Sequence, residues 1–330
     1  MKPCLSLTIL AAAFFAATNL PAQQQPPRLP LPEGVERRTV VIWSEGTRMS
    51  ADLYFPKDRK SAERLPSIVL CNGWGGTKRG APERLGARPA QNGFLALALD
   101  YRGWGESDSK LVIKGPMPKP DINGEVAVRA QAIREVVDPL DEAQDIGHAL
   151  DYLMGEPGVD TARIGLWGTS YGGGLVTWTA AHDPRVKCVV AQVSGMGVQG
   201  EAMRKKCRER ATQQARGDIG PIPQNYDKAA KLAGYANLAK MADYNAVEAA
   251  GKVNVPILFI DAENEDLMDR RLNGQKAYEI IKAKENVPTK YHVIKGITHF
   301  GIYKEGFEEA ANLFVDWFTE HLKRRKAKTP

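Results

Sequence analysis

The segment Gly168-Thr169-Ser170-Tyr171-Gly172 holds a serine with a glycine two positions before it and another two positions after it. Residues 163–167, just upstream, form a short apolar run typical of a buried strand, and residues 172–181 have the composition of a helix. A serine at a sharp strand-to-helix turn presents its hydroxyl to solvent, and glycines at these positions let the backbone bend. The pattern therefore predicts that Ser170 is a nucleophile.

Five histidines are candidates for the base that a serine hydroxyl needs at neutral pH. His148 and His321 fall within expected helices, and His292 falls within an expected strand. His182 ends the helix after the serine, on the far side from the hydroxyl. His299 follows a strand and lies in a loop, where the active-site residues of open α/β sheets gather. Elimination therefore predicts that His299 is the base.

A carboxylate is expected beside this histidine, because it holds the imidazole in the correct tautomer and stabilises the cation that forms. The apolar run 257–260 ends in the segment Asp261-Ala262-Glu263-Asn264-Glu265-Asp266, which is rich in acids. The residue types alone leave Asp261, Glu265 and Asp266 open as the third member. Whichever of them are not used then belong to a solvated acidic turn.

The elements that must position these residues read as alternating strands and helices. Helical stretches are expected at 81–91, 139–154 and 307–322, the last with apolar residues at a helical period. Near-continuous apolar strands that alternate with helices indicate a parallel sheet covered on both faces. The expected strands are 39–43 and 49–55, joined as a hairpin-like opening, then 65–71, 94–99, 163–167, 186–193, 255–260 and 291–294.

Two long insertions interrupt this alternation. Residues 108–136 contain three prolines and are expected to form a loop. Residues 196–250 are polar and mostly helix-forming, with an interruption at 217–223. The basic run 204–210 within them is expected to be a solvated helix face, with attraction of an anionic substrate as the alternative.

The two ends of the chain differ from its body. Residues 1–22 begin with a positive charge, continue as an Ala-rich apolar run and end in a small-residue cleavage site, as in a signal peptide. Residues 23–37 are Pro- and Gln-rich and are expected to form an exposed leader, and 323–330 to form a solvated basic tail. The protein is therefore expected to be secreted or periplasmic, without a stable membrane anchor. An uncleaved anchor is the alternative.

The composition argues against several other classes of function. The tail carries five of the six net positive charges, which leaves the body near neutral, so nucleic acid is not an expected partner. Of the four cysteines, Cys4 lies in the signal segment, and the other three do not resemble a disulfide framework. Neither C-x-x-C nor H-E-x-x-H occurs, and the turn at Gly73 lacks the third glycine of a dinucleotide fingerprint. No metal or cofactor is expected, and the oligomeric state stays open.

Four segments together resemble an α/β-hydrolase. They are Asn72-Gly73-Trp74-Gly75-Gly76 after one strand, Asp100-Tyr101-Arg102-Gly103-Trp104-Gly105-Glu106-Ser107 after the next, the segment around Ser170, and Gly296-Ile297-Thr298-His299-Phe300. The resemblance covers residues 38–322. Within that superfamily the chain looks most like the dienelactone-hydrolase and Xaa-Pro dipeptidyl-peptidase-like branches. This narrower likeness rests on residues 52–56, 100–103 and 299–303.

The resemblance implies a mostly parallel sheet of eight strands with helices on both faces and a helical cap insertion at about 196–250. It also places the acid in a turn written H-G-x-x-D after the penultimate strand. In this sequence Asp261-Ala262 stands in place of H-G, and the acid falls on Glu265, where aspartate is commoner. Asp266 and Asp261 remain the alternatives.

The resemblance further assigns the oxyanion hole to the backbone N–H groups of Trp74 and Tyr171. Loss of one such donor typically lowers the rate by about 10²–10³. Asn72 stands where the family more often has histidine, which affects only the supporting side-chain bonds. Trp104 follows the neighbouring strand and is a candidate for the pocket mouth, with packing in the core as the alternative.

These residues together predict a secreted serine hydrolase that cleaves carboxylic esters or related small acyl compounds. The alternative within the enzyme class is a peptidase for short or Pro-containing peptides. It would need an acidic pair to bind a substrate N-terminus, and no such pair stands out. The alternative from another class is a non-catalytic binding protein of the same fold. It is disfavoured because such proteins usually lack one of the two residues that this chain keeps as Ser170 and His299.

Overall fold

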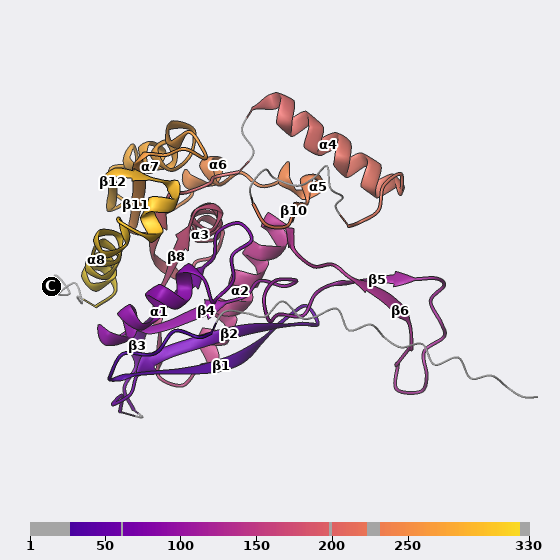
Figure 1. Cartoon of the computed structure of the whole chain (residues 1–330), viewed down its shortest axis with the longest axis horizontal. Coiled ribbons are helices and arrows are strands. Elements are labelled where there is room, and N and C mark those ends of the chain that lie inside the picture. Colours follow the sequence, from indigo (N-terminus) through magenta and orange to yellow (C-terminus); the bar gives the residue numbers. More distant parts are fainter. Residues whose placement is uncertain (1–26, 61, 198–199, 223–231, 324–330) are drawn as a thin grey trace, which may run out of the picture.

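The computed structural model describes residues 27–60, 62–197, 200–222 and 232–323. At its centre lies an eight-stranded sheet with the strand order β1-β2-β4-β3-β8-β9-β11-β12 (Figure 1). The strands are β1 (Val35–Ser44), β2 (Thr47–Pro56), β3 (Leu65–Cys71), β4 (Leu95–Leu99), β8 (Val159–Thr169), β9 (Val186–Gln192), β11 (Ile257–Asn264) and β12 (Thr289–Thr298). The mostly parallel sheet of eight strands expected from the sequence is confirmed.

The strand directions divide the sheet into a short antiparallel edge and a parallel remainder. β1 pairs with β2 in antiparallel register from Val35↔Pro56 to Ser44↔Thr47, and β2 pairs with β4 in the same sense. All other neighbours are parallel. β3 and β4 are buried at every residue because helices cover both faces, and this is why their sequences are continuously apolar.

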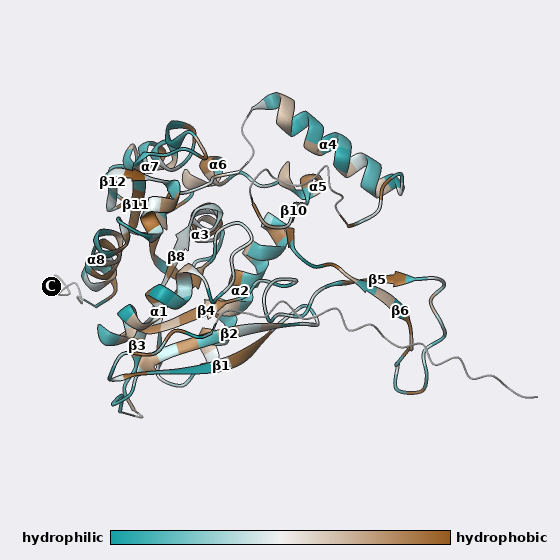
Figure 2. Cartoon of the chain, in the orientation of Figure 1, coloured by the Kyte–Doolittle hydropathy of each residue, from teal (hydrophilic) through white to brown (hydrophobic). Residues whose placement is uncertain are grey.

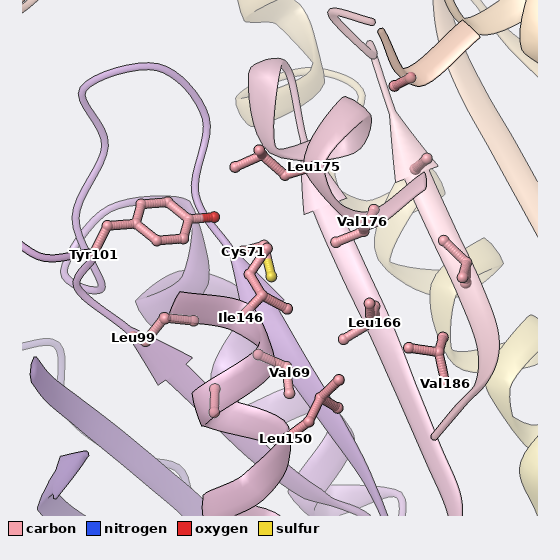
Figure 3. Packing of buried hydrophobic residues seen from close by; sticks show 14 of the residues in the cluster. Val69, Cys71, Leu99, Tyr101, Ile146, Leu150, Leu166, Leu175, Val176 and Val186 are labelled. Atoms are coloured by element: carbon pink, nitrogen blue, oxygen red, sulfur yellow. The ribbon is translucent and has the colours of Figure 1, made fainter. Parts of the chain in front are cut away.

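Helices cover the sheet on both faces. On one face, Ile146 and Leu150 of α2 belong to the same buried cluster as Val69 of β3 and Leu166 of β8 (Figure 3). On the other face, α1 and α8 pack through a second cluster. The main helices are α1 (Ala81–Gln91), α2 (Pro139–Gly155), α3 (Tyr171–His182), α7 (Gly274–Lys282) and α8 (Phe307–Phe318).

The start of α2 shows how the local sequence sets a helix boundary. The Asp138 side chain accepts a hydrogen bond from the backbone N–H of Asp141 at 3.2 Å, which satisfies one of the unpaired donors of the first turn. Pro139 occupies the first helical position, where its missing N–H costs no hydrogen bond. The predicted start of this helix at residue 139 is confirmed.

The insertion between β9 and β11 contains α4 (Glu201–Arg216), β10 (Tyr235–Ala236), α5 (Leu238–Met241) and α6 (Ala246–Ala250). Of the residues of α4 only Cys207 is buried, and most of the helix is hydrophilic (Figure 2). Its basic run is partly neutralised, because Arg204 pairs with Glu248 at 2.8 Å and Arg208 pairs with Asp243 at 2.6 Å. The basic run therefore lies on a solvated face.

Residues 108–136 are not the irregular loop expected from their prolines. β5 (Leu111–Lys114) and β6 (Arg129–Ala132) form an antiparallel hairpin with the register Leu111↔Ala132, and it projects from the body (Figure 1). All three prolines fall in the long connection between the strands, where proline removes no ladder hydrogen bond. β7 (Val136–Val137) then pairs in parallel with β10 of the insertion.

The predicted signal segment 1–22 lies outside the described residues, as does most of the basic tail. The expected leader ends earlier than predicted, because β1 begins at Val35 and pairs there with Pro56. Among the helices in the described ranges, none combines the length and apolar character needed to cross a bilayer.

Candidate active site

Ser170 lies at the sharp turn between β8 and α3, in a strained backbone conformation. Its φ of 54° and ψ of −127° are unfavourable for any residue with a side chain. A Cβ on Gly168 would lie 2.1 Å from the carbonyl oxygen of Gly172, and a Cβ on Gly172 would lie 2.2 Å from that of Asn72. Both glycines of the motif are therefore required by close backbone contacts, and not only by flexibility.

Backbone hydrogen bonds hold this strained turn in place. The N–H of Ser170 donates to the carbonyl oxygen of Gln192 at 2.8 Å. The carbonyl oxygen of Ser170 accepts from the N–H of Gly173 at 2.9 Å and from that of Gly195 at 3.0 Å. Neighbouring backbone on β9 and on the segment after it therefore fixes the direction of the serine side chain.

His299 contacts the serine directly. β12 ends at Thr298, and His299 begins a short 3₁₀ helix, His299–Tyr303. Its Nε2 lies 3.0 Å from the Oγ of Ser170, and the residue is only 1% exposed. The backbone N–H of His299 donates to Oδ1 of Asp266 at 3.1 Å, so Asp266 holds the main chain at this position.

Glu265 lies on the opposite side of the same ring. Its two carboxylate oxygens are 2.9 and 2.8 Å from Nδ1 of His299, and its side chain is 3% exposed. A hydrogen on Nδ1 directed at this carboxylate leaves the lone pair of Nε2 free to accept from the serine hydroxyl. Oε1 of Glu265 also accepts from the backbone N–H of Leu267 at 3.0 Å, which orients the carboxylate.

The other acids of this segment have different partners. Asp261 accepts a hydrogen bond from the hydroxyl of Tyr291 at 2.8 Å, and its burial raises the pKa of this carboxyl to about 6. Glu263 pairs with Lys295 at 2.8 Å and is far more exposed. Of the candidate acids, the structure brings Glu265 to the ring of His299, Asp266 to its backbone, and Asp261 to neither.

The two backbone donors suggested by the resemblance lie next to the serine. Tyr171 is the first residue of α3, so its N–H is one of the helix donors without an intrahelical partner. Neither its N–H nor that of Trp74 donates to an acceptor in the described part of the chain. The loop that holds Trp74 is close, because a Cβ on Gly73 would lie 3.0 Å from that of Ser170. Asn72 fastens this loop to β4 by donating to the carbonyl oxygen of Leu99 at 2.8 Å.

A cavity of about 260 Å³ opens beside Ser170 and His299. Its wall is mainly apolar, and the volume lies below the roughly 300–1,000 Å³ that is typical of sites for drug-sized ligands. The side chains that give it this character include Trp74, Leu232, Leu267, Phe300 and Tyr303, and Arg84 of α1 also lines it.

Trp104 does not line this cavity, so its assignment to the pocket mouth is wrong. It is 4% exposed, and its Nε1 donates to the carbonyl oxygen of Val136 at 3.0 Å. Its ring packs against Gly234, where a Cβ would lie 2.5 Å from the ring. The insertion thus covers Trp104, whereas the other tryptophan, Trp74, stays at the cavity and donates from Nε1 to Ala233 at 2.9 Å.

Sequence reasoning missed a polar contact beneath the site. The hydroxyl of Tyr303 lies 2.7 Å from Oγ1 of Thr169, which also accepts from Nε2 of Gln192 at 3.0 Å. Burial raises the pKa of Tyr303 to about 12, so the hydroxyl stays protonated at neutral pH. In the sequence, only the resemblance of residues 299–303 to the narrower branches of the superfamily marks Tyr303 as a candidate site residue. Arg84 had no such signal, because an arginine on a helix surface is ordinary.

The described ranges contain no group of three or more His, Cys, Asp or Glu side chains that could hold a metal ion. Cys71, Cys188 and Cys207 are free and buried, and burial raises the pKa of each thiol. Buried thiols with raised pKa values stay protonated at neutral pH, so these three cysteines are poor candidates for a nucleophile.

Two family models match the chain. The model of the prolyl oligopeptidase family matches residues 139–325, more than half of the chain. The model of the alpha/beta hydrolase fold matches residues 66–204. Together they include the elbow, the cap insertion and the two strands that precede Glu265 and His299. The resemblance to the α/β-hydrolase superfamily is confirmed by these matches.

Individual proteins are similar over most of the chain. A 31.7 kDa protein from the traX-finO intergenic region of Escherichia coli is 25% identical over 288 residues, which cover 78% of this chain and 91% of that protein. The thiohydrolase apmlB of Arthrinium phaeospermum is 28% identical over 197 residues, which cover 59% of this chain and 48% of that protein. The crystal structure of PA2218 from Pseudomonas aeruginosa has a TM-score of 0.67 and 23% identity over 91% of this chain and 98% of that one, a likeness of fold. The chain belongs to the prolyl oligopeptidase family of α/β-type hydrolases.

Proposed function

We propose that this protein is an exported serine hydrolase that cleaves carboxylic esters or related small acyl compounds. The observation that carries the proposal is the line of hydrogen bonds from Ser170 Oγ through the ring of His299 to Glu265, with lengths of 3.0 Å on one side and 2.8 Å on the other. This is the arrangement in which a histidine removes the proton of a serine hydroxyl while a carboxylate stabilises the resulting cation.

In the proposed reaction, Oγ of Ser170 attacks the substrate carbonyl carbon while its proton moves to Nε2 of His299. The carbonyl oxygen becomes an oxyanion and accepts hydrogen bonds from the backbone N–H groups of Tyr171 and Trp74. Collapse of this intermediate breaks the bond to the leaving alcohol, which takes the proton from His299. Water then attacks the acyl-serine while His299 takes a proton from it. The bond between the acyl carbon and Oγ breaks, Oγ takes the proton back from His299, and the carboxylic acid is released.

The size and character of the cavity support small acyl substrates. Its volume of about 260 Å³ and its apolar wall, with Trp74, Leu232 and Phe300, suit a short hydrocarbon or aromatic group better than a long peptide. The described residues that line it include no carboxylate, so none of them would pair with a positively charged peptide N-terminus. These features favour an ester over an aminopeptidase substrate.

A peptidase remains the second candidate, because the prolyl oligopeptidase family model matches residues 139–325. Both enzymes would form the same acyl-enzyme and differ only in the leaving group. A panel of p-nitrophenyl esters and aminoacyl-p-nitroanilides separates them. We expect hydrolysis of the esters, and faster hydrolysis of the anilides would replace the esterase proposal by the peptidase.

Labelling by a fluorophosphonate probe tests the proposed nucleophile before any substrate is known. We expect the wild-type protein to be labelled and Ser170→Ala to be unlabelled. Failure of the wild-type protein to react would favour the non-catalytic binding protein. Export is proposed from the character of residues 1–22, and the N-terminal sequence of protein taken from its native host should then begin near Gln23. A retained Met1 would contradict export with cleavage.

A further inference from the structure

One charged side chain, Arg84, lines the cavity beside Ser170 and His299. It lies on α1, and its Nη1 donates to the backbone carbonyl of Tyr303. Its guanidinium also lies over the ring of Phe307, with Cζ 4.3 Å from the ring centroid. These two contacts restrict the guanidinium of this exposed side chain to the neighbourhood of Tyr303, which also lines the cavity.

The other charged residues of α1 form ion pairs, whereas Arg84 has no ion-pair partner among residues 27–60, 62–197, 200–222 and 232–323. Glu83 pairs with Arg37 at 2.6 Å, and Arg88, one turn further along the helix, pairs with Glu308 at 2.6 Å. Arg84 forms no ion pair with any carboxylate in the described ranges. Among the described residues, this positive charge at the site therefore has no carboxylate partner.

The chemistry of this side chain selects its ligand. A guanidinium has five N–H donors in a rigid planar fork, and only one atom, Nη1, has a hydrogen-bond partner in the described ranges. The free edge matches the two oxygens of a carboxylate, which such a fork can bind in a bidentate manner. Arg84 is exposed, so solvent reaches such a pair. The basic run 204–210 of α4 does not compete for this role, because none of its residues lines the cavity.

We propose that Arg84 binds a carboxylate of the substrate, so that the preferred substrates are small esters that carry a negative charge near the scissile bond. This inference rests on the proposed esterase function. It names a class of substrate that neither the elbow nor the family match specifies, and it makes Arg84 a specificity-determining residue.

Two matched pairs of esters test the inference on the full-length protein. The first pair carries the charge on the acyl side and compares p-nitrophenyl hydrogen adipate with methyl p-nitrophenyl adipate. The second carries it on the alcohol side and compares 4-acetoxybenzoate with methyl 4-acetoxybenzoate. Within each pair the same type of bond is cleaved, and the ratio of kcat/KM for the acid to that for its neutral ester is compared between protein variants. This comparison isolates the interaction with the carboxylate, because the intrinsic reactivities of the two esters cancel.

We expect the ratio of the wild-type protein to be about tenfold higher than that of Arg84→Gln in at least one pair, since the variant loses a charge-assisted hydrogen bond to the carboxylate. Arg84→Lys should recover part of it, because the point charge remains without the fork. The advantage should also fall as the salt concentration rises. Arg88→Gln, one helical turn away, removes an equal charge outside the cavity and should leave both ratios unchanged.

The outcomes separate this inference from the proposed function. Hydrolysis of the neutral esters that depends on Ser170, with ratios in both pairs that Arg84→Gln does not change, would overturn the role of Arg84 and leave the esterase intact. A fall of the ratios in Arg88→Gln as large as that in Arg84→Gln would also overturn it, because a general effect of surface charge would explain both. Absence of Ser170-dependent hydrolysis of all four esters would instead contradict the proposed function.

Discussion

Oγ1 of Thr169 and the hydroxyl of Tyr303 lie 2.7 Å apart, which joins the end of the strand before Ser170 to the end of the 3₁₀ helix that begins at His299. Thr169 directly precedes Ser170, and Tyr303 belongs to the same 3₁₀ helix as His299. The contact therefore ties the positions of the two groups to each other from below the cavity. It is a relationship between two segments that are 134 residues apart in the chain.

Removal of this contact should loosen the pairing of the two groups. We expect Tyr303→Phe to lower kcat by about ten- to a hundredfold, because a small misplacement of reacting groups is costly. The free energy of unfolding should fall by about 1 kcal/mol. Steady-state kinetics and urea unfolding measure the two effects. Tyr152→Phe removes a hydroxyl that bonds to Glu156 far from the site, and should leave kcat unchanged.

Ser170 and His299 should act as a unit. We expect Ser170→Ala, His299→Ala and the double variant to be about equally inactive, since removing either group abolishes the same reaction route. The measurement is kcat/KM with a p-nitrophenyl ester for the three variants. Retention of more than about a tenth of the wild-type rate by Ser170→Ala would contradict the assignment, because loss of such a nucleophile normally costs orders of magnitude.

The acid is tested by a change that keeps its shape. Glu265→Gln should lower kcat by about 10³–10⁴, because an amide does not stabilise the imidazolium and favours the wrong tautomer. Glu265→Asp should recover only part of the rate, because its carboxylate is one methylene shorter and falls short of Nδ1. Glu263→Gln is the matched control, because this exposed acid pairs with Lys295 and not with His299. If Glu265→Gln had a kcat near that of Glu263→Gln, Glu265 would be excluded as the acid that supports His299.

Asp261 should make stability depend on pH. Burial raises its pKa to about 6 from an ordinary value of 3.8, so the folded state binds its proton more tightly than the unfolded state does. The stability contributed by this group is therefore present below about pH 4 and is lost as the pH rises to 6, by about 3 kcal/mol at most. Asp261→Asn keeps the acceptor for Tyr291 and removes the charge. Urea unfolding between pH 4.5 and 8 should show a gain over wild type that grows up to pH 6, and a constant difference would contradict it.

The glycines of the elbow should be intolerant of a methyl group. Gly168→Ala places a Cβ 2.1 Å from a backbone oxygen that cannot move aside without moving α3. We expect loss of soluble folded protein or a large fall in melting temperature. Gly147→Ala is the control, because nothing lies within 4 Å of its Cβ position in α2. It should raise the stability by about 0.5–1 kcal/mol, as measured by thermal unfolding.

Much of the fold was predictable because its signals are local. The apolar runs of β3 and β4 are continuous because both faces of those strands are covered, and the helix starting at residue 139 carries its own cap and proline. The hairpin at 108–136 was not predicted, because its strands are short, exposed and separated by a long proline-containing connection. Neither face of this hairpin is buried against the body, so its strands do not need to alternate between apolar and polar residues.

The sequence by itself determined the elbow around Ser170, because the small residues that a sharp turn needs lie within two positions of the serine. It also identified His299 as the base by elimination among the histidines. Only the tertiary structure decided which acid meets that histidine. Asp261 lies within β11, whereas Glu265 and Asp266 follow this strand. The partners of all three acids are thirty or more residues away in the chain, on β12 and at His299. The same holds for Trp104, which the insertion buries, and for Arg84, which the fold brings to the cavity. Spacing along the chain carries information about local geometry, whereas the neighbours of a side chain are fixed by packing between distant segments.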